Sequence, residues 1–475
     1  MSPLQPTIIS RPEHCISRKW ISPNAIRVLY RLKDAGKYAY LVGGGVRDLL
    51  LGREPKDFDI VTDATPGEIK KLFRNCRLIG RRFRLAHIHF HNEIIEVATF
   101  RSNSTGEPDE EATVEFKAAT LVALPNSEPG TTGVSALKRS KPPLMLKTVG
   151  GMILRDNVFG SPEEDARRRD FTVNALFYNI ADFSVIDYVG GMQDLRNGFI
   201  RIIGDPRVRF TEDPVRMVRA IRFAAGLGFE IEGNTYHAML ELKEKVALAS
   251  SARMYEEVLK LFMLGEGEKT YQMLRKIGLF GVIFPSLNDW VDTESDDFPH
   301  IWIGKALGRV DTLVQSGKQV PPHILFALLF GQYVEEKATE LRKTGIPALD
   351  SITRTVAEVL AEQTQRVQIP KKIALAMRDI YWNQSRFEKR EGKTPRYFLR
   401  RSVFGDAYEY LCFSSEATGE KKEIIEWWKE FIETNRPVPV ATGYEKKSCK
   451  LSARPLYKKR RGRLRSKSGK QKPKS

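Results

Sequence analysis

A glycine turn followed closely by two aspartates constrains this chain more than any other feature. Residues 40–62 read YLVGGGVRDLLLGREPKDFDIVT. The apolar residues 38–42 predict a short strand, Gly43-Gly44-Gly45 a tight turn, and residues 46–51 a helix that opens on the turn. Glycines there let backbone N–H groups approach a phosphate closely, and the helix N-terminus adds partial positive charge. Arg47 can supply a formal positive charge to a triphosphate.

The two aspartates lie in residues 57–61, where polar and apolar residues alternate. On a strand, Asp57 and Asp59 face the same side, so their carboxylates converge. Two carboxylates beside a phosphate-binding turn are what a pair of Mg²⁺ ions about 3.5–4 Å apart requires. The pattern predicts nucleotidyl transfer with Asp57 and Asp59 as catalytic metal ligands and two Mg²⁺ ions, or Mn²⁺, as cofactor.

Other phosphate-binding motifs fit the glycines less well. No Gly-Lys-Ser/Thr follows them, so this is not the P-loop of nucleotide triphosphatases. The sequence GGGVRD also lacks the third glycine of the dinucleotide-binding pattern G-x-G-x-x-G. A glycine turn or an Asp-x-Asp pair alone is common in structures without any site. The combination of strand, turn, arginine helix and aspartate pair within 23 residues carries the hypothesis.

Three stretches resemble, in order, motifs of the class II tRNA nucleotidyltransferase and bacterial poly(A) polymerase superfamily. They are VGGGVRDLLLG…PKDFDIVT, RRDFTVNAL and EDPVRMVRAIRF. The resemblance covers residues 16–265 closely and the remainder loosely. Residues 78–90 (LIGRRFRLAHIHF) are similar to the stretch that marks the bacterial poly(A) polymerase branch rather than the CCA-adding enzymes. The segment RPEHCISRK (residues 11–19) and the basic C-terminal tail favour the same branch.

The fold class expected is an α/β head, followed by an all-α neck and body and a disordered basic tail. The head is a nucleotidyltransferase palm with a small mixed sheet and helices on one side, over residues 17–195. Residues 102–150 are small, polar and without periodicity, which predicts a mobile insertion. Residues 196–265 form a neck that binds nucleotide and RNA, residues 266–445 a helical body, and residues 446–475 the tail.

Within these parts the hydrophobic periodicity predicts individual elements. In the head we expect helices over residues 22–34, with Ser22 as N-cap, and 66–73, and strands near 77–79, 86–90, 94–100 and 183–189. Beyond the head we expect helices over residues 214–227, 234–249, 253–264, 269–277, 323–330, 349–364, 371–381 and 421–434.

A third active-site carboxylate has two candidates. Asp170, in ARRRDFTVNAL, matches an aspartate that the family treats as part of the active site, and the arginine before it, Arg169, matches a triphosphate contact. An aspartate among arginines also suits a structural ion pair. Glu96, in IIEVATFR, is the rival, because its strand is expected to pair near the aspartate strand. We favour Asp170.

The motif EDPVRMVRAIR predicts base recognition. Asp213 and Arg216 are neighbours on a helix, so they present an acceptor beside a donor. Adenine and cytosine both show an amino donor beside a ring-nitrogen acceptor, whereas guanine and uracil reverse the pattern and would leave a buried charge without a partner. The pair therefore stands in for a template but does not separate ATP from CTP. Arg219 and Arg222 resemble further nucleotide contacts of the family. In the plainer interpretation, Asp213 caps a helix whose arginines face solvent.

Charge and composition limit the partners and the cellular location that the chain is expected to have. Residues 446–475 hold 14 Lys and Arg and no acid, out of a net charge of +18 for the chain. Such a tail has too few apolar groups to pack, and it would hold RNA by counterion release; a solubilising tail without a specific role is the alternative. The longest strongly apolar run, residues 324–330, is too short to span a bilayer. Four well-separated cysteines and a polar N-terminus indicate a cytoplasmic protein with reduced thiols.

The function expected is template-independent addition of AMP from ATP to RNA 3′ ends. Its partners would be ATP, RNA 3′ ends and RNA-decay proteins. The rivals are a CCA- or A-adding tRNA nucleotidyltransferase and a non-catalytic RNA-binding protein, and no His and Asp cluster suggests a phosphohydrolase. His87, His89 and His91 alternate on one strand face, where contact with RNA or solvent fits better than a metal site. Residues 81–84 (RRFR) suit an RNA or triphosphate surface, and a solvated loop equally well.

Overall fold

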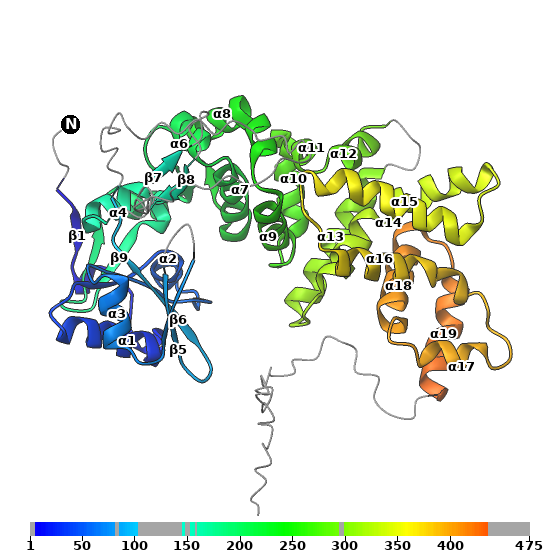
Figure 1. Ribbon diagram of the computed structural model, residues 1–475, viewed down its shortest axis with the longest axis horizontal. Coiled ribbons are helices and arrows are strands. Elements are labelled where there is room, and N and C mark those ends of the chain that lie inside the picture. Colours follow the sequence, from blue (N-terminus) through cyan, green and yellow to red (C-terminus); the bar gives the residue numbers. More distant parts are fainter. Residues whose placement is uncertain are drawn as a thin grey trace, which may run out of the picture.

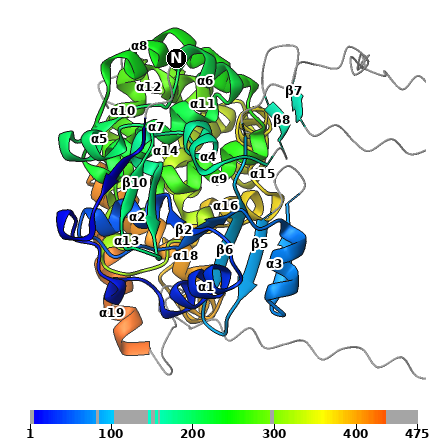
Figure 2. The same cartoon turned by 90° about the vertical axis from the view of Figure 1, so that its left-hand side faces the viewer.

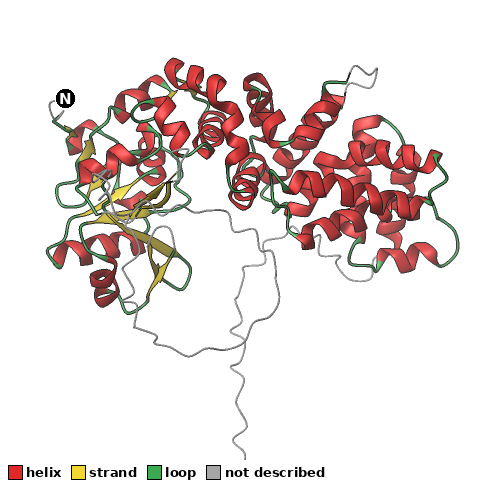
Figure 3. Ribbon diagram, turned by 45° about the horizontal axis from the view of Figure 1, so that its top comes forward, coloured by secondary structure: helices red, strands yellow, loops and turns green. Residues whose placement is uncertain are grey.

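The computed structural model of the chain describes residues 5–80, 85–102, 145–147, 153–156, 159–293 and 299–435. An α/β head, a helical neck and a helical body follow one another along the long axis of the molecule (Figure 1). Strands gather in the head and helices fill the remainder (Figure 3), which confirms the expected fold class. The tail expected over residues 446–475 lies outside the described residues, as does most of the insertion expected over residues 102–150.

One eight-stranded sheet organises the head. Its strand order is β1-β10-β9-β2-β3-β6-β5-β4. β3 and β6 pair in parallel and the other neighbours pair antiparallel, so the sheet is mixed, as expected. The edge strand β1 precedes residue 17, the residue at which we expected the head to start. The strands are β1 (Thr7–Ile9), β2 (Ala39–Val42), β3 (Asp59–Thr62), β4 (Cys76–Ile79), β5 (Leu85–His89), β6 (Ile94–Thr99), β9 (Leu176–Asn179) and β10 (Val185–Asp187); β7 (Met145–Lys147) and β8 (Ile153–Asp156) form a separate pair.

Both faces of the sheet are covered, although we expected helices on one side only. Leu41, Ile60 and Val97 belong to the larger apolar core, on the face where α1 (Pro23–Asp34) and α3 (Pro66–Leu72) contact the strands. Seen end-on, the head shows α1 and α3 beside β5 and β6 (Figure 2). Val42, Val61 and Phe177 form a second cluster with Ala166 of α4 (Pro162–Arg168). Ser22 caps α1 as predicted, because its hydroxyl accepts from the Asn24 N–H at 3.2 Å.

The neck is joined to the head by backbone hydrogen bonds rather than by a loose linker. The Ile203 N–H donates to the Asp170 carbonyl at 3.0 Å, and the Thr172 N–H donates to the Arg201 carbonyl at 3.0 Å. These bonds fix the neck against the segment that follows α4. Its elements are α6 (Pro206–Glu212), α7 (Val215–Leu227), α8 (Gly233–Leu242), the 3₁₀ helix η4 (Lys243–Leu248), α9 (Ser251–Phe262) and the parallel strand pair β11 (Phe199–Ile200) and β12 (Glu230–Ile231); α5 (Gly191–Asn197) precedes them.

The body holds more helix than the periodicity predicts. The helix expected over residues 323–330 continues to residue 343. Gly331 lies inside this helix, and the position requires glycine because a Cβ there would collide with the Tyr410 ring. Within the described ranges, no helix is long and apolar enough to cross a membrane. The helices are α10 (Gly267–Ile277), α11 (Leu279–Ile283), α12 (Pro285–Val291), α13 (Pro299–Gln315), α14 (Pro322–Lys343), α15 (Ala348–Thr364), α16 (Lys371–Trp382), α17 (Thr394–Leu399), α18 (Phe404–Thr418) and α19 (Lys422–Asn435).

Candidate active site

The glycine turn packs directly against the aspartate strand and an arginine from a distant segment. Gly43 has φ +77° and precedes α2 (Gly44–Leu50), which begins two residues earlier than predicted. A Cβ added at Gly43 would lie 3.5 Å from Nη1 of Arg169 and 3.8 Å from Oδ2 of Asp59. A Cβ added at Gly45 would lie 3.1 Å from the Asp57 carbonyl oxygen. Glycine is therefore required both by the backbone angle and by the close approach of the aspartate segment.

The two aspartates share the exposed side of their segment, as the alternation predicts. Phe58 and Ile60 are buried between and after them. β3 begins only at Asp59, so Asp57 lies just before the strand rather than within it. Glu96 of β6 is the register partner of Asp59. The second aspartate and Glu96 consequently lie side by side on adjacent parallel strands.

The carboxylates of Asp57, Asp59 and Glu96 repel one another. The pKa of Asp59 is raised from 3.8 to about 6, first because surrounding protein withdraws water from the carboxylate and second because of the negative charges of Glu96 and Asp57. Arg169 acts in the opposite direction and lowers the pKa. The side chain nevertheless keeps a solvent-exposed face. A bound cation would relieve this repulsion and favour the ionised form, so Asp59 is a candidate cation ligand.

His87 extends the same row by one strand. It is the register partner of Glu96 on β5, and its Nε2 lies 3.0 Å from Oε1 of Glu96. Of the three histidines that we considered as an RNA or solvent surface, His87 thus contacts Glu96, and His91 lies beyond the end of β5. In the part of the chain that the structure describes, no three His, Cys, Asp or Glu side chains form a metal-binding group by themselves. Mg²⁺ commonly takes only one or two carboxylates and completes its shell with water and substrate phosphates, so Asp59 and Glu96 fit that ion.

Asp170, which we favoured as the third carboxylate, is committed to other partners. Its Oδ2 accepts from Nε and Nη2 of Arg219 at 2.9 and 2.5 Å. Its Oδ1 accepts from the Phe171 N–H at 2.8 Å and from Nδ2 of Asn174 at 3.2 Å. Burial by itself would raise the pKa of Asp170, but the Arg219 charge and these hydrogen bonds hold it below its ordinary value. Asp170 thus lies in an ion pair with Arg219, whereas Glu96 lies beside Asp59.

Arg47 is linked to the same buried aspartate through an asparagine. Its Nη1 donates to Oδ1 of Asn174 at 2.7 Å, and its Nε and Nη2 donate to Oδ1 of Asp48 at 2.9 and 2.7 Å. The guanidinium is buried, and its Nη2 lies 3.5 Å from the position of a Cβ on Gly44. Arg47 therefore supports the turn from beneath with its charge, and its contact with a triphosphate stays a prediction.

Arg209, which the sequence reasoning missed, holds the segment that carries Arg169. Its Nη2 donates to the Arg168 and Arg169 carbonyls at 2.5 and 2.6 Å, and its Nη1 donates to Glu212 at 3.0 Å. Burial, together with the charge of Arg216, lowers the pKa of Arg209 to about 10. Arg169 itself donates to Oδ2 of Asp165 at 2.9 and 3.1 Å. These contacts fix the direction in which Arg169 faces Gly43.

Phe223 of α7 collects three arginines around its ring. The guanidinium carbons of Arg47, Arg219 and Arg222 lie 5.3, 5.4 and 4.3 Å from its centroid. Cations favour the face of an aromatic ring, so one apolar side chain holds like charges together. Glu257 of α9 offsets part of that charge, since its carboxylate lies 3.3 Å from Nε of Arg222 and 3.6 Å from Nη1 of Arg219.

The predicted base-reading pair lies at the junction of α6 and α7. Asp213 follows the end of α6, and both of its carboxylate oxygens accept from Arg253 of α9 at 2.7 and 2.8 Å. Arg216 donates through Nη1 to the Arg209 carbonyl at 2.8 Å. A carboxylate oxygen has two lone pairs and a guanidinium has five N–H groups, so these contacts leave Asp213 acceptor capacity and Arg216 donor capacity. Arg253 had no signal in the sequence, because it lies 40 residues away.

Comparison with known proteins decides the family. Three family models match: "Poly A polymerase head domain" over residues 39–201, "Probable RNA and SrmB- binding site of polymerase A" over residues 228–291, and "Polymerase A arginine-rich C-terminus" over residues 344–467. Poly(A) polymerase I of Escherichia coli O157:H7 is 43% identical over 430 residues, which cover 90% of this chain and 86% of that protein. The chain belongs to the bacterial poly(A) polymerase I family. It is accordingly a nucleotidyltransferase, and the resemblance on which the sequence analysis rests is confirmed.

The related CCA-adding enzymes match less of the chain. The CCA-adding enzyme of Leuconostoc mesenteroides is 33% identical over 264 residues, 55% of each protein. A solved tRNA nucleotidyltransferase, complexed with a primer tRNA and an incoming ATP analogue, has a TM-score of 0.54 and 21% identity over 86% of this chain and 98% of its own. At that identity the likeness concerns the fold alone. Enzymes with different names thus share this architecture.

The Asp59 environment leads to a prediction about stability without metal. Because the folded-state pKa of about 6 exceeds the ordinary 3.8, ionisation of Asp59 opposes folding, and the penalty grows as pH rises through that window. In chelator, Asp59→Asn should therefore raise the melting temperature at pH 8 by about 1–2 °C, a modest value because the exposed carboxylate is screened by water. The gain should shrink at pH 5. Thermal melts at both pH values check this.

The matched control is Asp34→Asn, an exposed aspartate near the end of α1. It should leave the difference between pH 8 and pH 5 unchanged. Mg²⁺ should raise the melting temperature of the unaltered chain more than that of Asp59→Asn. Equal stabilisation of both by Mg²⁺ would contradict the assignment of Asp59 to a cation site.

Proposed function

We propose that this chain adds AMP from ATP to RNA 3′ ends without a template. The observation that carries the proposal is the convergence on the glycine turn, where Asp59 and Arg169 both lie against Gly43 and Glu96 lies beside Asp59. Carboxylates and a guanidinium around one turn suit a metal-bound triphosphate. The poly(A) polymerase I relatives, matched over 90% of the chain, support the choice of an RNA 3′ end as acceptor.

In the proposed reaction, the RNA 3′-oxygen bonds to the α-phosphorus of ATP and the bond to the β-phosphate oxygen breaks. Pyrophosphate leaves, and the hydroxyl proton passes to solvent. Asp57, Asp59 and Glu96 would hold the divalent ions, whose chemistry when bound is to acidify the attacking hydroxyl and neutralise the leaving pyrophosphate. Their carboxylates supply the oxygen ligands that hard cations prefer.

Arg169 and the backbone of Gly43 and Gly44 are the proposed triphosphate contacts. Arg169 projects over the turn while Asp165 and the Arg209 hydrogen bonds hold its segment in place. Arg47 contributes positive charge from beneath the turn. Arg219 and Arg222 line the same side of the neck through the Phe223 ring, and we propose that they complete the nucleotide site. Asp170 then acts as a positioning residue, because it holds Arg219.

Adenine selection is assigned to Asp213 and Arg216. Asp213 would accept a hydrogen bond from the adenine amino group, and Arg216 would donate to the ring nitrogen beside it. Arg253 fixes the Asp213 carboxylate from α9, which makes the acceptor rigid. Guanine and uracil present the reversed pattern and would leave a charged group without a partner, at a cost of several kcal/mol.

The proposed role of the product is to promote RNA decay in the cytoplasm, with RNA-decay proteins as partners. The basic residues 446–475 would hold the RNA substrate by counterion release. Their 14 cations among 30 residues support that role through charge alone.

A primer-extension gel tests the function. The purified chain with Mg²⁺ is given each nucleoside triphosphate singly, with either an unstructured RNA or a tRNA that ends before its CCA. We expect long ladders on the unstructured RNA with ATP alone. Addition of one to three residues, confined to the tRNA and with CTP accepted, would instead establish a CCA-type enzyme. A protein that extends neither primer would be an RNA-binding scaffold.

The carboxylate assignment makes a sharper prediction. Asp57→Asn, Asp59→Asn and Glu96→Gln should each reduce AMP incorporation by about 10³-fold or more, because each removes an oxygen ligand of the metal site. Asp170→Asn should instead raise the KM for ATP, by releasing Arg219, and leave the Mg²⁺ concentration dependence unchanged. Steady-state kinetics with Mg²⁺ titrations measure both effects, and Asp34→Asn is the control. Activity within about tenfold of the unaltered chain in Glu96→Gln would return the third position to Asp170.

Base selection is tested separately. Arg216→Ala should reduce the preference for ATP over GTP and UTP by about 10- to 100-fold while RNA affinity stays nearly constant. The control is Arg207→Ala, which removes the same charge from α6 at an exposed pair with Glu241. Competition assays with paired nucleotides give the ratios of kcat/KM. Unchanged discrimination in Arg216→Ala would remove it from the base-reading role.

A further inference from the structure

A pocket in the head lies on the opposite face of the sheet from the candidate active site. It has a volume of about 450 Å³, and its walls are Arg11, Ser17, Arg18, Lys19, Ile26, Tyr178 and Phe183. Tyr178 of β9 is the register partner of Leu41, whereas the next residue of β2, Val42, pairs with Asp59. Successive strand residues point to opposite faces. The Tyr178 wall and the Asp59 carboxylate therefore point away from each other, and the proposed polymerase reaction does not use this pocket.

A partly buried hydrogen-bond network holds the N-terminal side of the pocket in place. Nδ1 of His14 accepts from the Ile16 N–H at 3.2 Å, so the ring proton is on Nε2, which donates to the Phe183 carbonyl at 2.8 Å. Arg11 donates to the His14 carbonyl at 3.0 Å. The segment that carries the cations is thus fastened to the turn between β9 and β10, 169 residues later in the chain.

Phe183 has an unusual backbone for an aromatic residue. Its φ is +64°, a left-handed conformation that side chains other than glycine rarely adopt. The conformation is held by the hydrogen bond from its N–H to the Asn179 carbonyl at 2.8 Å and by Arg18, whose guanidinium lies 4.6 Å from the ring centroid. Such strain persists where the surroundings over-determine it and is concentrated at functional sites.

The charge of the pocket is positive and is not offset by a carboxylate in its walls. Within the described ranges, Arg11, Arg18 and Lys19 form no ion pair with an acid, and Arg18 donates instead to the Tyr30 hydroxyl at 3.0 Å. The nearby carboxylates of Glu13 and Asp182 accept hydrogen bonds from Ser10 and Ser184, and neither residue belongs to the pocket walls. Besides the three cations, the walls consist of Ser17 and of aromatic and aliphatic side chains.

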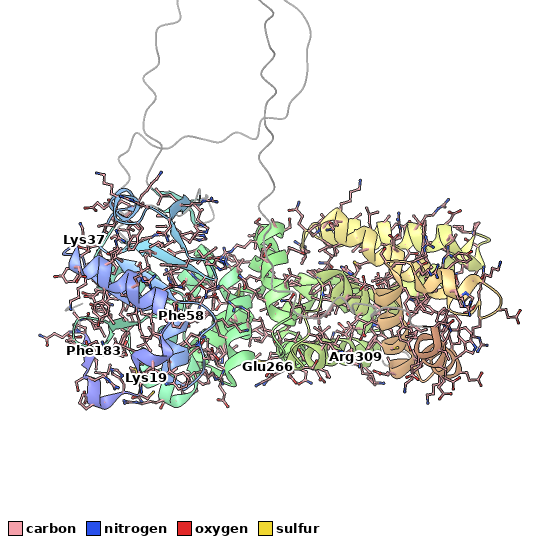
Figure 4. All side chains as sticks on the ribbon, turned by 90° about the horizontal axis from the view of Figure 1, so that it is seen from below. Lys19, Lys37, Phe58, Phe183, Glu266 and Arg309 are labelled. Atoms are coloured by element: carbon pink, nitrogen blue, oxygen red, sulfur yellow. The ribbon has the colours of Figure 1, made fainter. Side chains whose placement is uncertain are left out.

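We propose that this pocket binds a nucleotide through its phosphate. The guanidinium groups of Arg11 and Arg18 and the Lys19 ammonium match phosphate oxygens, and the apolar wall of Ile26 and Phe183 suits a base. The volume lies in the range of small-molecule sites. Lys19 and Phe183 lie near each other at the head end of the molecule (Figure 4). The nucleotide belongs either to an RNA strand, away from its 3′ end, or to the free nucleotide pool.

Photocrosslinking of the full chain distinguishes the two sources. One arm uses oligo(A) that contains 4-thiouridine, and the other uses 8-azidoadenosine 5′-monophosphate; crosslinked peptides are mapped by mass spectrometry. Crosslinks to residues 11–26 or 176–184 with the oligonucleotide alone assign the pocket to RNA. The same crosslinks with the mononucleotide alone assign it to a free nucleotide. No crosslink to these peptides in either arm overturns the proposal.

Two exposed cations give the matching variants. The double variant Arg11→Gln with Lys19→Gln should lower the crosslinking yield about tenfold, since two charge-assisted phosphate contacts are lost. If the RNA arm holds, the slope of log affinity against log salt should also fall by about 0.7 per lost contact. Lys71→Gln removes an exposed lysine of α3 outside the pocket and is the control. Equal crosslinking in the double variant and the control overturns the proposal, and Lys19→Gln alone provides the same comparison if the double variant does not fold.

Discussion

The partly buried ion pair between Asp170 and Arg219 joins the head to the neck. Burial of a carboxylate is costly unless a charge and hydrogen bonds compensate for it. Here both oxygens are satisfied by Arg219, Asn174 and the Phe171 N–H. The relative position of the two parts is consequently fixed by a few polar atoms rather than by apolar packing alone.

Two carboxylates of the candidate site, Asp170 and Asp59, have pKa values shifted in opposite directions. Asp170 has abundant donors and a lowered pKa, so it is ionised and occupied. Asp59 lies beside Glu96 and Asp57 and has a raised pKa, because burial and these charges outweigh the compensation from Arg169. Environments that push the pKa values of neighbouring acids apart commonly mark different roles. We infer that Asp170 builds the frame and that Asp59 presents a charge for a cation.

The sequence predicts those features whose parts lie close together in the chain. The glycine turn, the exposed side shared by Asp57 and Asp59, the Ser22 cap and the course of α7 all follow from local spacing and periodicity. β1 was missed because its identity depends on pairing with β10, about 180 residues away. The sequence offers both Asp170 and Glu96 as the third carboxylate, Asp170 through the family resemblance and Glu96 through the expected pairing of its strand. Their contacts depend on long-range structure, namely the register of β3 with β6 and the Arg219 ion pair.

The residues that hold the site were the least visible in the sequence. Arg209 and Arg253 carry no motif that separates them from the arginines of any amphipathic helix, and Phe223, although it ends the recognised stretch EDPVRMVRAIRF, had no predicted role. Their roles arise from contacts between α6, α7, α9 and the segment after α4, and these contacts are long-range. Asn174 lies within the recognised stretch RRDFTVNAL, yet its bridging position between Arg47 and Asp170 depends on the tertiary fold.

Selection between adenine and cytosine has to come from this frame and not from the base-reading pair. In the proposed base-reading role, both bases would offer the same donor and acceptor edge to Asp213 and Arg216, so the pair would reject guanine and uracil only. The difference between a purine and a pyrimidine is one of size, and the distance from the proposed base-reading pair to the proposed triphosphate contact would read that size. Arg209 would set that distance, because its side chain holds the Arg168 and Arg169 carbonyls while its own carbonyl accepts from Arg216. One buried arginine thus joins the proposed triphosphate contact to the proposed base contact, and it is the residue whose position would decide which of the two bases fits.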